Sequence, residues 1–157
     1  MGSESRYRLG AGVMLVNAQS HVWVGRRIDN KDEAWQMPQG GIDKGEEPLQ
    51  GALRELEEET GIAPHLVEPV AGASPLELQY DLPETLQPHL WGGKYVGQKQ
   101  HWYLMRFMGE DAHVNIATEH PEFSHWKWVE AQLLPELIVP FKRDMYRAIV
   151  SEFSRWL

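Results

Sequence analysis

The chain has 157 residues, of which 42% are hydrophobic and 24% charged, and it contains no cysteine. This composition is that of a soluble globular protein, and it excludes disulfides, zinc–thiolate sites and a cysteine nucleophile. The formal net charge of −8 disfavours a protein that binds DNA or RNA along its length.

No apolar run approaches the ~20 residues of a membrane span, and no secretory signal is visible at the start. We therefore expect no membrane partner and a cytoplasmic location. The length predicts one domain over residues 1–157. The Gly-Ser pair near the start is typical of a cloning remnant, so residues 1–5 are expected to be disordered or foreign to the domain.

The first half of the chain predicts a hairpin and then an extended segment. Residues 7–16 and 21–27 are rich in β-forming residues, and the polar run 17–20 between them predicts a turn. Residues 35–39 are predicted to be extended, and Pro38 suits the end or the edge of a sheet.

Residues 48–60 are predicted to form a helix. Pro48 suits its first position, Gly61 suits a left-handed cap after its end, and Glu47 with Gln50 makes a weak capping pair. Apolar residues at i, i+3, i+4 and i+7 predict one stripe that packs on the core: Leu49, Ala52, Leu53 and Leu56.

The second half is dominated by predicted strands, with one further helix. The strand segments are 66–80 in part, 97–108, which carries the strongest signal, and 126–129. Residues 141–157 predict a helix with Met145, Ile149 and Phe153 on one face, and the Pro- and Gly-rich residues 82–93 predict a mobile loop. Two helices far apart among strands favour an α/β fold in which helices cover a mixed sheet.

The helix at 48–60 carries a dense set of acidic side chains. At about 100° per residue, Glu55, Glu58 and Glu59 fall on one flank of the apolar stripe, and Glu57 falls on the opposite flank. Glu59 lies at the edge of the stripe and is expected to be half buried. Arg54 precedes Glu58 by four residues, so it is expected to hold that carboxylate in place.

Two interpretations of this acidic flank are open. A solvated helix face would interleave both signs of charge, but no Lys or Arg lies among residues 55–59. Carboxylates about 6 Å apart repel by roughly 3 kcal/mol per pair at an effective dielectric near 20, and a divalent cation relieves that repulsion. A shared cation is therefore the better interpretation of the cluster.

These residues resemble the Nudix box, a pattern with nine fixed points. The matching positions are Gly40, Glu46, Arg54, Glu55, Leu56, Glu58, Glu59, Gly61 and Ile62. The resemblance implies an α/β/α sandwich and a hydrolase that cleaves a nucleoside diphosphate linked to another group. It also implies two or more Mg²⁺ or Mn²⁺ ions on Glu55, Glu58 and Glu59, with the backbone carbonyl of Gly40 as a further ligand.

The rest of the chain resembles one branch of that family, which contains the bacterial RNA pyrophosphohydrolases and the plant-type diadenosine tetraphosphate hydrolases. The segments that carry this likeness are Tyr7-Arg8, 35–41, 97–100, 121–123, 126–128 and 141–144, and 90–94 resembles the plant-type enzymes in particular. Leu9 departs from the branch, where Pro is common; Pro fixes backbone shape rather than chemistry. By resemblance, Glu122 completes the metal site from outside the helix, with Glu119 as a competing neighbour.

Several further residues are candidates for contact with the substrate. Arg8 and Arg27 match the phosphate pocket of the branch, although each is also explained as a solvated strand residue. Tyr80 and Phe141 are either plain core or an aromatic pair that sandwiches a base, where stacking contributes about 1–3 kcal/mol. Weaker candidates are Gln39, Lys94, Gln98 and Lys99.

The leading hypothesis is therefore metal-dependent hydrolysis of a 5′-nucleoside polyphosphate, with a triphosphorylated RNA end as substrate. A dinucleoside polyphosphate such as diadenosine tetraphosphate is the alternative, and one enzyme that acts on both is compatible with the sequence. A non-catalytic nucleotide sensor and a nucleotide-pool housecleaning enzyme are less favoured, because the box is intact and the additional segments are present. The general base is left open among Glu55, Glu58 and Glu122, and the oligomeric state is undetermined.

Overall fold

The computed structural model describes residues 6–29 and 33–157, so the prediction for residues 1–5 lies outside the described residues. Its centre is a mixed sheet in the order β3-β2-β1-β7-β5, with β4 paired to β1, β6 to β7 and β8 to β2. The strands are β1 (Tyr7–Val16), β2 (Val22–Arg27), β3 (Trp35–Gln36), β4 (Gln39–Gly41), β5 (Val67–Pro69), β6 (Leu76–Asp81), β7 (Gly97–Phe107) and β8 (Phe123–Val129). β1 and β7 pair in parallel over ten residues, and the other described pairings are antiparallel.

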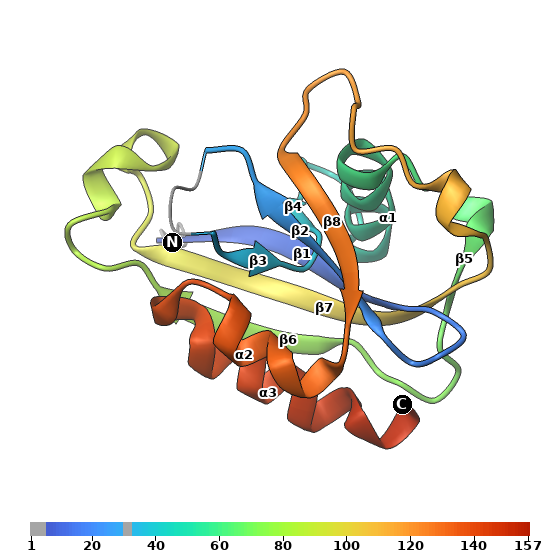
Figure 1. The fold of residues 1–157 in the computed structure, drawn as a ribbon. Helices are drawn as coiled ribbons and strands as arrows, with labels where there is room; N and C mark the ends of the chain where they lie inside the picture. Colours follow the sequence, from blue (N-terminus) through green and yellow to red (C-terminus); the bar gives the residue numbers. More distant parts are fainter. Residues whose placement is uncertain (1–5, 30–32) are drawn as a thin grey trace.

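Helices cover both faces of the sheet, as expected for an α/β/α sandwich (Figure 1). α1 (Pro48–Thr60) packs on one face, where Leu56 joins a core cluster with Val13 and Met105. α2 (Leu134–Leu137) and α3 (Arg143–Phe153) lie on the other face. The predicted α3 stripe of Met145, Ile149 and Phe153 is buried there against residues such as Trp102.

The predicted hairpin is confirmed only at its turn. β1 and β2 are antiparallel partners at Val16 and Val22, and beyond this point the two strands diverge. β1 continues between β4 and β7, and β2 continues between β3 and β8. The divergence brings residues 39–41 alongside β1, and this places the loop before α1 at the centre of the fold.

The bounds of the central helix agree with the sequence prediction, but part of its stripe does not. The side chains of Glu47 and Gln50 form a reciprocal capping box, and Gly61 ends α1 with φ of 73°. Ala52 and Leu56 are buried, whereas Leu53 is partly exposed and Leu49 is 36% exposed, because the first turn of α1 extends past the sheet. Glu59, expected to be half buried, is only 1% exposed.

Elsewhere the predicted elements are shorter than expected. Residues 66–80 form two strands, β5 and β6, on either side of a turn at 70–75. Residues 82–93 contain two short 3₁₀ turns, and α3 is flanked by such turns at 140–142 and 154–156. In the described residues, no helix is both long enough and apolar enough to cross a membrane.

The contact between β6 and β7 depends on Gly97. A Cβ at this position would collide with the backbone carbonyl oxygen of Tyr80, and a backbone atom cannot turn aside as a side chain can. We predict that Gly97→Ala lowers the free energy of unfolding by about 3 kcal/mol. Gly45→Ala is the control: its φ is 82° but nothing surrounds it, so only the backbone cost of about 1 kcal/mol is expected. Thermal unfolding measures both, and equal losses would contradict the prediction.

Candidate active site

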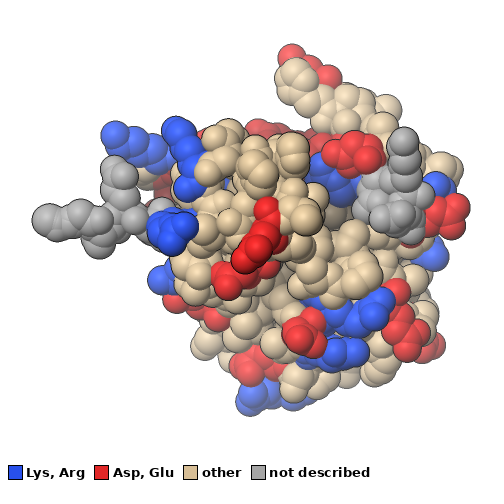
Figure 2. Space-filling model, turned by 90° about the vertical axis from the view of Figure 1, so that its left-hand side faces the viewer, with Lys and Arg blue, Asp and Glu red and all other residues tan. Residues whose placement is uncertain are grey.

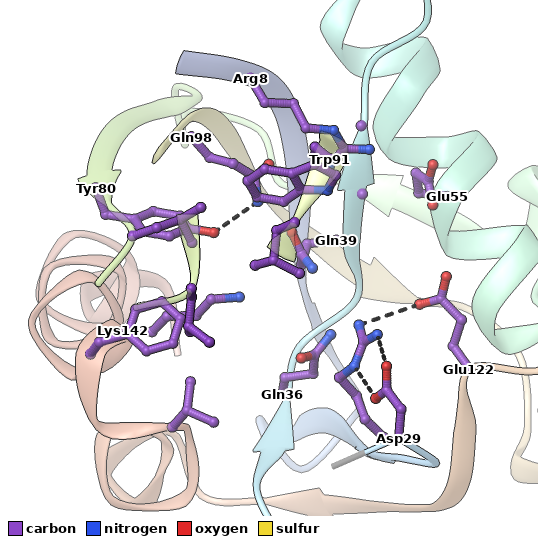
Figure 3. Close-up of a pocket in the computed structure, with 18 residues that line it drawn as sticks. Arg8, Asp29, Gln36, Gln39, Glu55, Tyr80, Trp91, Gln98, Glu122 and Lys142 are labelled. Atoms are coloured by element: carbon purple, nitrogen blue, oxygen red, sulfur yellow. Dashed lines mark hydrogen bonds and ion pairs between the residues drawn. The ribbon is translucent and has the colours of Figure 1, made fainter. Parts of the chain in front are cut away.

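The site is built around a pocket of about 610 Å³ at one end of the sheet (Figure 3). This volume is in the usual range for a small-molecule site. β1, β2 and β4 supply its floor, α1 supplies Glu55, and the loop before β8 supplies Glu122. Predicted site residues that line it are Arg8, Arg27, Gln39, Gly40, Glu55, Tyr80, Gln98, Glu122 and Phe141.

Arg54 is the hub beside this pocket. Its guanidinium donates to both carboxylate oxygens of Glu46, at 2.8 and 3.0 Å, and to the carbonyl oxygen of Gly41 at 2.8 Å. One nitrogen, Nη1, donates to Glu55 at 2.9 Å and to Glu58 at 3.1 Å. The predicted contact with Glu58 is thus one of several, and the bidentate partner is Glu46. The Arg54 guanidinium lowers the pKa of Glu46 and so keeps that carboxylate ionised.

The buried acid of the site is Glu59. One of its oxygens accepts a hydrogen bond from the backbone N–H of Gln39 at 3.0 Å, and the other oxygen is buried without a partner. Burial, and then the neighbouring Glu122, raises the pKa of Glu59 well above its ordinary value. Burial also raises the pKa of Glu55, against the opposing effect of Arg54. A buried carboxylate oxygen without a donor is costly, and a cation is one way to satisfy it.

Glu122, rather than its competitor Glu119, lies at the pocket. Its backbone carbonyl accepts from the N–H of Ile28 at 2.9 Å, which fixes the loop to the end of β2. Its carboxylate lies 3.8 Å from the guanidinium of Arg27 and is close enough to Glu59 to raise its pKa. Figure 3 shows Glu122 and Glu55 on the same side of the cavity.

These residues fit a divalent metal, although they do not form a finished cage. Within the described ranges, no three His, Asp or Glu side chains are close enough to one another to hold an ion. The donors are nevertheless oxygens, which magnesium prefers, and the unpartnered oxygen of Glu59 calls for a cation. The Glu55 carboxylate also lies so close to Gly40 that a Cβ there would collide with it. Metal binding by Glu55, Glu58, Glu59, Glu122 and the Gly40 carbonyl stays a prediction.

Cationic groups line the pocket across from these acids. Arg27 makes two hydrogen bonds of 2.8 Å to Asp29, which hold its guanidinium at the pocket edge. Lys142 points into the cavity (Figure 3), and burial lowers its pKa to about 8, with the nearby Arg27 acting in the same direction. Anionic phosphates placed between the acids and these cations would meet both a metal site and direct donors.

The aromatic pair does not form an open sandwich. The ring centroids of Tyr80 and Phe141 are 6.2 Å apart at an interplanar angle of 43°, which is the geometry of direct contact. A base cannot enter between rings that already touch, so in this arrangement the pair forms one wall of the pocket. The hydroxyl of Tyr80 accepts from Gln98 at 2.8 Å, and this bond fixes the wall to β7.

Two predicted contacts lie elsewhere. Side chains alternate between the faces of β7, so Lys99 points away from the face of Gln98 and Gln100 and pairs with Glu77 at 3.2 Å. Lys94 is exposed at the end of a turn and does not line the pocket. Both candidates are therefore corrected: neither is placed to contact a ligand in this pocket.

Sequence reasoning missed several pocket residues. Gln36 is 5% exposed and lines the pocket, and its side-chain nitrogen is buried without a hydrogen-bond partner. Trp91 and Lys142 also line it. The signals were present but weak: Gln36 lies in the segment before the box, Trp91 precedes two glycines, and Lys142 follows Phe141.

Comparisons with known proteins agree with this arrangement. The NUDIX domain profile matches residues 6–149. A relative from Erythrobacter litoralis named RNA pyrophosphohydrolase is 58% identical over 94% of this chain and 91% of its own length. One of the same name from Roseobacter denitrificans is 58% identical over 96% and 94%. The crystal structure of a C. elegans Ap4A hydrolase binary complex matches with a TM-score of 0.66 at 18% identity, covering 92% of this chain and 98% of that one.

The mixed sheet between helices and the acidic helix beside a cationic pocket define the class, and the chain belongs to the Nudix family. Its identity with the curated relatives extends over nearly its full length, and it is a pyrophosphohydrolase of that family, an enzyme that acts on acid anhydrides. Nudix hydrolases generally use divalent metal ions, which agrees with the oxygen donors described above.

If Glu59 is a metal ligand, magnesium should stabilise the protein through it. We predict that magnesium at 100 times its dissociation constant raises the free energy of unfolding of the wild type by about 2.7 kcal/mol. Glu59→Gln should abolish this shift and, without magnesium, be at least as stable, because a buried ionisable group has been removed. Glu57→Gln, on the exposed side of α1, should keep the shift. Thermal unfolding with and without magnesium tests this, and an unchanged shift in Glu59→Gln would contradict it.

Lys142 should make substrate binding sensitive to alkaline pH. Because burial lowers its pKa to about 8, its positive charge is lost as pH rises through 8, and kcat/KM should fall by about fivefold. Lys142→Arg, which stays charged, should flatten this limb of the profile. The folded pKa is below the ordinary value of 10.5, so the same group disfavours folding below pH 8, and this cost fades between pH 8 and 10.5. An alkaline limb that survives in Lys142→Arg would assign the titration to another group.

Proposed function

We propose that the protein removes pyrophosphate from the 5′-triphosphate end of RNA, with Mg²⁺ or Mn²⁺ as cofactor. The observation that carries this proposal is one pocket with carboxylates on one side and Arg8, Arg27 and Lys142 on the other. Relatives that are 58% identical over at least 94% of this chain carry the name RNA pyrophosphohydrolase, which supports the substrate. The proposal includes a cytoplasmic role in RNA decay.

The charge of the protein favours binding an RNA end over binding a stretch of RNA. The net charge is −8, and Figure 2 shows Lys and Arg in separate groups on the face in view rather than in a continuous band. A protein that follows a nucleic-acid backbone needs such a band. A triphosphate end needs only a compact site in which cations offset its several charges.

In the proposed reaction, the carboxylates of Glu55, Glu58, Glu59 and Glu122 hold two or more divalent ions, with the Gly40 carbonyl as a further ligand. The ions supply charge neutralisation and lower the pKa of bound water. Arg54 orients Glu55 and Glu58 through its two hydrogen bonds from Nη1. One carboxylate among Glu55, Glu58 and Glu122 accepts the proton of the attacking water.

The remaining pocket residues bind the substrate in this proposal. Arg8, Arg27 and Lys142 contact the phosphates, Gln39 and Gln98 supply amide groups, and the wall of Tyr80 and Phe141 lies against a base. The water oxygen becomes part of a phosphate, the phosphoanhydride breaks, and pyrophosphate leaves a 5′-monophosphorylated RNA.

Diadenosine tetraphosphate is the second candidate substrate. The segment Leu90–Lys94 resembles plant-type hydrolases of that compound, and Leu90 and Trp91 from it line the pocket. The deciding experiment measures kcat/KM for a short triphosphorylated RNA and for diadenosine tetraphosphate in one buffer. A ratio well above one supports the RNA end as substrate, and a ratio well below one supports the dinucleotide.

A nucleotide sensor without catalysis and a nucleotide-pool housecleaning enzyme are excluded by different outcomes. A sensor would show no turnover in magnesium, whereas the proposed enzyme turns over in magnesium and stops when a chelator is added. A housecleaning enzyme would prefer free nucleoside triphosphates over a triphosphorylated RNA of the same first base. All carboxylates of the box are present in this chain, which favours turnover.

Glu58 and Glu57 form a matched pair for testing the acidic flank. We predict that Glu58→Gln lowers kcat by at least about 100-fold, because it removes a metal ligand. Its stability should be nearly unchanged, since the Glu58 side chain is 58% exposed and its ion pair with Arg54 contributes little. Glu57→Gln should be nearly silent in both measurements. Full activity in Glu58→Gln under magnesium, or a large loss in Glu57→Gln, would refute this assignment.

A further inference from the structure

Trp91 occupies an unusual backbone conformation at the pocket edge. It has φ of 50°, and Gly92 and Gly93 follow with 69° and 73°, so three successive residues are left-handed. This conformation is routine for glycine but is a genuine outlier for a bulky side chain. Such strain persists where the surroundings fix it, and it often marks a functional position. The backbone therefore aims the indole of Trp91 in a direction that an ordinary turn would not give.

The indole is aimed at Arg8. The guanidinium carbon of Arg8 lies 4.9 Å from the centre of the Trp91 ring, which is within the range of a cation–π contact. The side chain of Tyr95 meets the indole edge to face, with ring centroids 6.3 Å apart, and supports it. Figure 3 shows Arg8 and Trp91 together above the cavity, on the side of Glu55.

The other side of the Arg8 guanidinium lies against the loop before α1. A Cβ at Gly41 would collide with that guanidinium, so Arg8 fits only because residue 41 is a glycine. The carbonyl of Gly41 is already an acceptor for Arg54, which fixes this backbone in place. Arg8 is thus held between an aromatic ring and a fixed peptide.

Arg8 has contacts to its faces, and its hydrogen-bonding edges are left for a ligand. Within residues 6–29 and 33–157 no acidic side chain pairs with Arg8, whereas Arg27 is bound on two nitrogens by Asp29. A guanidinium held by its faces keeps its N–H donors in one plane, and this is the geometry that binds phosphate oxygens in a bidentate manner.

We propose that Trp91 is a positioning residue that holds the Arg8 guanidinium in the orientation that binds the substrate's phosphates. This inference rests on the proposed function only in taking phosphates as the ligand of Arg8. Trp91 acts through Arg8 and does not stack on the base. Its contribution is to binding, so it should appear in KM and in the affinity for a phosphate analogue, and not in kcat.

The test compares variants that keep or remove the aromatic face. Trp91→Phe keeps a π face over Arg8, whereas Trp91→Leu and Trp91→Met keep bulk without one; two such variants guard against one that does not fold. The probe is methylenebisphosphonate, a pyrophosphate analogue that has no base and cannot be hydrolysed, titrated by calorimetry at fixed magnesium. We expect binding about five- to tenfold weaker in Trp91→Leu and Trp91→Met and within twofold of wild type in Trp91→Phe.

A double-mutant cycle with Arg8→Gln shows whether Trp91 acts through Arg8. In the Arg8→Gln background, Trp91→Leu should weaken binding by less than twofold, because the cation that it positions is gone. An equal loss in both backgrounds, or equal losses in Trp91→Leu and Trp91→Phe, would overturn the proposal. Unchanged analogue binding with weaker RNA binding would also overturn it and assign Trp91 to stacking on a base.

Failure of this inference is distinguishable from failure of the proposed function. The calorimetric titration needs no turnover, so it reports on Trp91 and Arg8 even if triphosphorylated RNA is not the substrate. In kinetic assays with the better substrate, Trp91→Leu should raise KM about five- to tenfold and leave kcat within twofold. A drop in kcat with unchanged KM would contradict a positioning role in binding.

Discussion

The guanidinium of Arg54 joins three parts of the chain that the site cannot do without. It binds Glu46 from the loop, the Gly41 carbonyl at the end of β4, and Glu55 and Glu58 on its own helix. Each contact is charge-assisted, and the pair with Glu46 is bidentate, so the loop and the helix form one rigid unit. The positions of Gly40, of the acids and, through Gly41, of Arg8 all depend on this one side chain.

The sequence predicted best what is decided locally. The bounds of α1 follow from Pro48 and Gly61, and the buried face of α3 follows from the spacing of its apolar residues. Burial was predicted less well, because it depends on what packs against a helix. Leu49 extends past the sheet into solvent, and Glu59 lies beneath Gln39 and Glu122, two neighbours that come from distant parts of the chain.

The same division holds for the site. The box pattern identified the acids and Arg54, but it could not show that Glu46 is the strongest partner of that arginine, because the loop between them must fold back first. Lys99 was misplaced since a single step along β7 reverses the face of the sheet, and register was not available from the sequence. Trp91 was missed because its importance lies in a contact with Arg8, 83 positions away along the chain.

The parallel pairing of β1 with β7 sets an order in which the molecule can assemble. Arg8 pairs with Gln98 and Tyr7 with Gly97, so the phosphate side of the pocket joins segments about 90 positions apart. Non-local pairings form slowly because the intervening chain must first be closed into a loop. During synthesis on the ribosome, the loop and helix bearing the acids emerge well before β7. The nascent chain should therefore gain its acidic half early and become able to bind substrate only near the end of translation.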